Sequence, residues 1–111
     1  MNRIITALAA VCVLALSWAG PATAQNSAKQ FKVTLLGTGT PPPFMHRFGP
    51  AILIQAGGRN LLFDSGRGVT QRLFQLKIPL GKIDHVFLTH LHSDHVVGIP
   101  DLWLTGWLGA P

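Results

Sequence analysis

The sequence predicts an α/β fold, and three observations lead to this prediction. Short apolar segments bounded by glycine and proline, which are typical of strands, recur from Phe31 onward. Two segments, one after Val69 and one after Pro100, space their apolar side chains as helices do. Metal-ligating side chains follow directly after the strand-like segment 83–89. In α/β folds, functional groups collect at the carboxyl ends of strands, so this order fits the class.

A separate segment precedes these elements. It carries one positive charge, Arg3, and then an uncharged, mostly apolar stretch over residues 4–19. A Gly-Pro pair and the small-residue triplet Ala22-Thr23-Ala24 follow. These features predict a secretory signal peptide over residues 1–24, cleaved before Gln25. The apolar stretch is shorter than the roughly 20 residues that span a bilayer, so a retained membrane anchor is disfavoured.

Export limits the chemistry of the remaining domain, residues 25–111. Cys12 lies in the leader, so the domain has no thiolate for a metal site or a disulfide. The chain has nine Lys or Arg and four Asp or Glu, and loss of Arg3 leaves a net charge of +4. These charges are dispersed, which more often reflects solubility than nucleic-acid binding. A small anionic substrate fits the charge equally well, and the export signal disfavours nucleic acid.

The first half of the domain reads as three strands joined by turns. Residues 31–36 alternate and then become apolar, which predicts a strand. Three prolines follow, so residues 38–50 should form an extended loop without ladder hydrogen bonds. Residues 51–56 are the next predicted strand, and the turn at 57–60 leads into a third over 61–64. The glycines at 37 and 39 are expected to serve turn geometry.

A helix and a strand are predicted next. Val69, Leu73 and Leu76 share one helical face, which predicts a short amphipathic helix over 69–76. Residues 83–89 are almost wholly apolar, which is typical of a strand buried on both faces.

A last helix should begin near Pro100. Asp101 is of a type that caps helices, and Trp103 and Trp107 lie four residues apart on one face. That face is expected to be core in a complete domain and exposed in the 111-residue chain, where it would favour aggregation.

The run His90-Leu91-His92-Ser93-Asp94-His95 is the most informative part of the chain, because four potential metal ligands occupy six residues. Such side chains are poor core formers, and zinc and its first-row neighbours prefer imidazole and carboxylate ligands. His90 and His92 are two residues apart, so in an extended segment they point the same way and share a metal. Asp94 and His95 should face another direction and serve a second metal. Two metals about 3.5 to 4 Å apart activate one bridging water, which is hydrolytic chemistry.

The same run, with L-T before it and G-I-P at 98–100, resembles the H-x-H-x-D-H signature of the metallo-β-lactamase superfamily. The segments L-G-T-G-T-P at 36–41 and L-L-F-D-S-G-R-G at 61–68 are similar to its tRNase Z and arylsulfatase-like branch. The resemblance extends from about residue 31 to 107 and implies an αββα sandwich, of which residues 25–111 form the amino-terminal half.

The resemblance also implies a site. His90 and His92 would serve one metal, Asp94 and His95 the other, and Asp94 would orient or deprotonate the bridging water. Asp64 would support the metal loop by contacting the ligands without binding the metal itself. The alternative is that Asp64 is an ordinary turn carboxylate. A complete site would hold two Zn²⁺, and manganese or iron would accept the same donors. The family's remaining ligands are downstream, and no histidine follows His95, so both sites are expected to be incomplete here.

Three functions follow from these expectations. The first is hydrolysis of phosphodiester or sulfate ester bonds by a metal-bound hydroxide. The second is hydrolysis of a β-lactam or another ester or amide. The third is a truncated, inert fragment that at most binds metal. Two further histidines, His46 and His85, are interpreted as solvated surface residues.

Overall fold

The computed structural model describes residues 30–109, so the predicted signal peptide lies outside the described residues. Four strands form one sheet in the order β1-β2-β3-β4, in which β1, β2 and β3 are antiparallel neighbours and β4 pairs in parallel with β3. The strands are β1 (Phe31–Gly37), β2 (Ala51–Ala56), β3 (Arg59–Phe63) and β4 (His85–Phe87). The helices are α2 (Val69–Gln75), a 3-10 turn (Leu80–Lys82), α3 (Ser93–Val96) and α4 (Ile99–Leu108).

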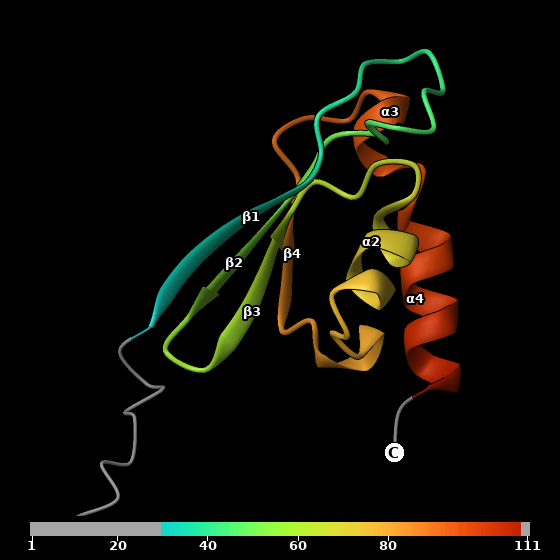
Figure 1. Ribbon diagram of the computed structural model, residues 1–111. Helices are drawn as coiled ribbons and strands as arrows, with labels where there is room; N and C mark the ends of the chain where they lie inside the picture. Colours follow the sequence, from blue (N-terminus) through green and yellow to red (C-terminus); the bar gives the residue numbers. More distant parts are fainter. Residues whose placement is uncertain (1–29, 110–111) are drawn as a thin grey trace, which may run out of the picture.

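The sheet is covered on one face. Figure 1 shows α2 and α4 side by side against the sheet, while α3 and the loop after β1 lie at the strand ends. Leu53, Leu62 and Leu73 are fully buried between this face and the helices. The opposite face of the sheet carries apolar side chains that are open to solvent: Phe31 is 69% exposed and Leu35 is 63% exposed.

The three predicted strands of the first half are confirmed, with shifted ends. β3 begins at Arg59 because Gly57 and Gly58 alone make a two-residue turn, with φ of 57° and 78°. Asp64, expected at the end of β3, leaves the strand with φ of 60°. The predicted helix is confirmed as α2, but Leu76 lies beyond its end and is 43% exposed.

The predicted burial of the strand over 83–89 is wrong for this structure. β4 spans only His85–Phe87, and its Val86 and Phe87 are 42% and 45% exposed. Within residues 30–109, β4 pairs only with β3 and is therefore an edge strand. An apolar groove of about 560 Å³, lined in part by Val86 and Leu88, runs between β4 and α4.

The last helix is confirmed, but its predicted cap is not. In the described chain no side chain caps α4, whose first turn follows Gly98. Asp101 instead accepts hydrogen bonds from the hydroxyls of Thr70, at 2.5 Å, and Thr105, at 3.1 Å. Trp103 and Trp107 are 74% and 70% exposed, as expected for the 111-residue chain.

The proline-rich loop 38–50 contains no strand, as predicted. It is nevertheless closed by two backbone hydrogen bonds, from the Thr38 amide to the Arg47 carbonyl and from the Gly39 amide to the Phe48 carbonyl. None of the helices described for residues 30–109 is long and apolar enough to cross a membrane.

Candidate metal centre

The four candidate ligands lie where the sequence placed them, beyond the carboxyl end of β4. His90 and His92 belong to the loop after the strand, whereas Asp94 and His95 belong to α3, a single helical turn. The sequence did not predict α3. Its turn buries Asp94, whereas His90 and His92 are exposed. The ring of His95 nevertheless lies 3.9 Å from that of His90, centroid to centroid, so the expected difference in direction stays a prediction.

The ligand segment is fastened to the turn that follows β3. The Ser65 amide donates to the His95 carbonyl at 2.7 Å, and the Gly98 amide donates to the Ser65 carbonyl at 2.8 Å. The approach is so close that a Cβ added at Gly66 would lie 2.6 Å from the Asp94 carbonyl oxygen. A side chain at this position would force the ligand segment away, which explains the glycine here.

Asp64 is the main polar link between these two segments. Its side chain is only 9% exposed. One carboxylate oxygen accepts the Thr89 amide at 2.8 Å, and the other accepts the Thr89 hydroxyl and the His95 Nδ1, both at 2.8 Å. Of the two interpretations of Asp64, the observed contacts correspond to support of the ligand loop.

Several influences act on the pKa of Asp64. Burial alone would raise it, but the Thr89 amide, the His95 imidazole and the Thr89 hydroxyl all donate to the carboxylate. Together with the charge of His95, these donors outweigh burial and lower the pKa of Asp64 from its ordinary value. Asp64 is therefore an ionised acceptor at neutral pH.

His90 and His92 present two ring nitrogens to each other. The His90 Nε2 lies 3.1 Å from the His92 Nδ1, and both side chains are exposed. Two nitrogens bound to one tetrahedral metal at about 2.0 to 2.1 Å would be about 3.3 Å apart. The observed separation therefore fits two ligands of one shared cation.

Asp94 and His95 form the second pair, and they are much less exposed. Asp94 is 8% exposed, and its Oδ2 lies 3.8 Å from the His95 Nε2. Both donors could reach a single cation, because two bonds of about 2.1 Å span up to about 4.2 Å. Among residues 30–109, no group of three His, Cys, Asp or Glu side chains converges into a metal-holding set. The donors are present as two adjoining pairs, because the His90 ring also lies against the His95 ring.

Sequence reasoning missed one residue of this cluster, Thr89. Its hydroxyl contacts Asp64, and also lies 3.1 Å from the His90 Nδ1. The sequence signal for it is its position directly before the ligand run. His85 lies on β4 outside the cluster and is exposed.

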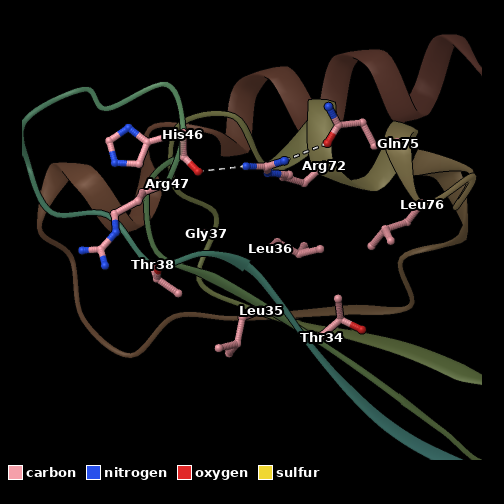
Figure 2. Close-up of a pocket in the computed structure, with 10 residues that line it drawn as sticks. All are labelled: Thr34, Leu35, Leu36, Gly37, Thr38, His46, Arg47, Arg72, Gln75 and Leu76. Atoms are coloured by element: carbon pink, nitrogen blue, oxygen red, sulfur yellow. Dashed lines mark hydrogen bonds between the residues drawn. The ribbon is translucent and has the colours of Figure 1, made fainter.

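A second hollow lies under the proline-rich loop, between β1 and α2. Its volume is about 290 Å³, and its lining includes His46, Arg47 and Arg72 but no candidate ligand. Figure 2 shows the Arg72 guanidinium donating hydrogen bonds to the His46 carbonyl and to Gln75, while the Arg47 side chain points away from Arg72. The cationic groups do not converge, so this hollow is not a second candidate centre.

Two known proteins are similar to this chain in sequence. The ribonuclease Z of Mycolicibacterium gilvum is 47% identical over 77 residues, which cover 69% of this chain and 27% of that protein. The ribonuclease Z of Mycobacterium marinum is 46% identical over the same share of this chain and 28% of its own length. The chain thus spans little more than a quarter of the length of these relatives.

Solved structures agree with the sequence relatives. The short form of human tRNase Z superposes with a TM-score of 0.65 and 39% identity, over 68% of this chain and 29% of that one. The metallo-β-lactamase fold protein YhfI from Bacillus subtilis also gives 0.65, with 34% identity over 71% of this chain and 32% of that one. The fold is therefore part of the metallo-β-lactamase sandwich, as the resemblance implied.

One protein family matches residues 31–107, from the first strand to the last helix, and it is described as Anti-Pycsar protein Apyc1. That range includes Asp64, Thr89 and all four candidate ligands. The chain therefore belongs to the Apyc1 family, within the metallo-β-lactamase superfamily and on its tRNase Z side.

Proposed function

We propose that the protein is a metal-dependent hydrolase of phosphodiester bonds and that its centre holds two divalent cations, with zinc as the favoured metal. The observation that carries the proposal is the arrangement of donors in two pairs, His90 with His92 and Asp94 with His95, at distances that suit two cations. The similarity to ribonuclease Z and tRNase Z supports a phosphodiester rather than a sulfate ester.

The donor set favours zinc on chemical grounds. Three imidazoles and one carboxylate are borderline donors that zinc accepts readily, and manganese or iron would accept them less selectively. When bound, the cations supply a nucleophile at neutral pH and stabilise the negative charge that develops on the phosphoryl oxygens.

The protein's own contribution is position and proton transfer. Asp64 holds α3 and the loop before it, so that the His95 ring keeps a fixed orientation. Asp94 is buried beside His95, and in this proposal its carboxylate would accept a proton from the attacking water. The exposed His90 and His92 leave the other side of the centre open to a substrate.

Hydrolysis assays with three classes of substrate test this assignment. The purified full-length protein should hydrolyse bis(p-nitrophenyl) phosphate, lose that activity with a chelator and regain it with zinc. Cleavage of a nitrocephalosporin but of no phosphodiester would instead support the alternative, a β-lactam or other amide or ester hydrolase. Cleavage of an aryl sulfate alone would move the substrate to sulfate esters.

An inert metal-binding fragment is the second candidate, and the open arrangement of two donors per cation favours it for the 111-residue chain taken alone. Detectable chelator-sensitive hydrolysis by residues 25–111 would reject it.

We also propose that the protein is exported and that a small anionic or ester substrate, rather than nucleic acid, is its partner. A mature protein that begins at Gln25, as measured by mass spectrometry of the secreted material, would support export. A protein that keeps Met1 or Asn2 and stays inside the cell would contradict it.

A further inference from the structure

Thr89 lies between the two donor pairs. Its hydroxyl oxygen is 2.8 Å and 3.0 Å from the two Asp64 carboxylate oxygens and 3.1 Å from the His90 Nδ1. The same Asp64 oxygen that contacts the hydroxyl at 2.8 Å also contacts the His95 Nδ1 at 2.8 Å. One hydroxyl and one carboxylate thus contact a ring from each pair.

The available protons determine the direction of each hydrogen bond. An ionised carboxylate only accepts, so the single hydroxyl proton of Thr89 goes to Asp64. The hydroxyl oxygen is then left as an acceptor, and its contact with His90 is a hydrogen bond only if the His90 Nδ1 carries a proton. For the same reason the His95 Nδ1 must carry a proton to donate to Asp64.

We propose that Thr89 is a positioning residue that fixes His90 as its Nδ1–H tautomer. A neutral imidazole protonated at Nδ1 has its lone pair on Nε2, and the His90 Nε2 is the atom 3.1 Å from the His92 Nδ1. Thr89 therefore turns the free lone pair of His90 toward the place where the first pair would share a cation. This inference rests on the proposed function only for the cation; the tautomer itself is a property of the metal-free protein.

Asp64 consequently sets the tautomer of one histidine in each pair. It contacts His95 directly and acts on His90 through Thr89. This arrangement would let one buried charge prepare both halves of the centre. A threonine that acted only in packing would contribute through its methyl group, and the isosteric change to valine separates the two cases.

The first test is made on the metal-free full-length protein. Long-range ¹H–¹⁵N spectra at a pH of about 8.5, above the usual titration range of imidazole, report which ring nitrogen of His90 carries the proton. We expect Nδ1–H in the wild type, a shift toward Nε2–H in Thr89→Val, and recovery of Nδ1–H in Thr89→Ser. A predominant Nε2–H form in the wild type would overturn the proposal, whether or not the valine variant folds.

The second test is zinc affinity, measured by competition with a chromophoric chelator. Thr89→Val should weaken the first zinc equivalent about 10- to 100-fold, which is typical of losing a residue that orients a ligand, and Thr89→Ser should restore it. Thr105→Val, the same change at an exposed position of α4, is the matched control and should leave affinity unchanged. Equal affinities for wild type and Thr89→Val would overturn the proposal.

The two tests also separate this inference from the proposed function. If the wild type bound no zinc but His90 showed the expected tautomer, the metal assignment would fail and the positioning by Thr89 would stand.

Discussion

The two ends of the ligand run differ in how firmly the fold holds them. Asp94 and His95 lie in a helical turn, are largely buried, and are tied to Asp64 and Ser65 by hydrogen bonds. His90 and His92 lie in an exposed loop. The Thr89 hydroxyl contacts the His90 ring, the two rings contact each other, and the His92 carbonyl accepts the His95 amide at 3.0 Å. The buried end is thus held by hydrogen bonds to the turn after β3, whereas the side chains of the exposed end are largely open to solvent.

This difference has an energetic reason. A buried carboxylate such as Asp64 costs free energy unless donors surround it, and in the metal-free chain Thr89 and His95 supply those donors. Exposed imidazoles are solvated by water, so they have no comparable burial cost in the metal-free protein. The following changes test this comparison, from the largest expected effect to the smallest.

Removing the buried carboxylate should have the largest effect. Asp94→Ala should reduce phosphodiester turnover by about 10²- to 10⁴-fold, because it removes both a proton acceptor and a metal ligand. Metal analysis should show fewer bound cations per chain. Unchanged turnover would contradict the placement of Asp94 at the chemistry.

Neutralising Asp64, which binds the buried end of the ligand run, should have the second-largest effect. Asp64→Asn keeps the side-chain shape and tolerates the left-handed backbone at φ of 60°, but it turns one acceptor into a donor facing His95 or Thr89. We expect zinc affinity to fall about 10- to 100-fold. Asp84→Asn, a change in an exposed ion pair with Arg59, is the matched control and should have little effect on zinc.

The stability of the metal-free protein compares the two ends directly. His95→Ala should lower the free energy of unfolding by about 1–3 kcal/mol, because it leaves Asp64 without one of its donors. His92→Ala should change it by less than about 0.5 kcal/mol, because that ring is exposed. Urea unfolding in the presence of a chelator measures both, and equal losses would contradict the comparison.

The smallest effect is expected at Leu91, between the two exposed histidines. Its side chain is 79% exposed, so Leu91→Ser should leave both stability and zinc affinity within error of the wild type. A marked loss of affinity would mean that the exposed end is held more firmly than its contacts indicate.

Local pattern was enough to predict most of the fold. Strand alternation located β1 and β2, and apolar spacing located α2 and α4, because these signals depend on neighbours in the chain. Burial of β4 was predicted wrongly because the number of layers around a strand is set by distant segments. Asp101 was assigned to a cap, but tertiary contact with Thr70 gave its carboxylate another partner.

The site was predictable in part for the same reason. The four candidate ligands are adjacent in sequence, and their identity alone suggested a metal. The contact of Thr89 with Asp64 joins residues 25 positions apart, and it depends on the parallel pairing of β3 with β4. No local pattern specifies that pairing. The resemblance suggested Asp64 as a support of the metal loop, but its contacts and the part of Thr89 required the structure.

The most direct test of the central claim is the number of zinc ions bound by the full-length protein, measured by elemental analysis after dialysis. Two per chain in the wild type, and fewer in Asp94→Ala, is the result that two donor pairs predict. No bound zinc in the wild type, or a count that Asp94→Ala leaves unchanged, would contradict a two-cation centre at His90–His95.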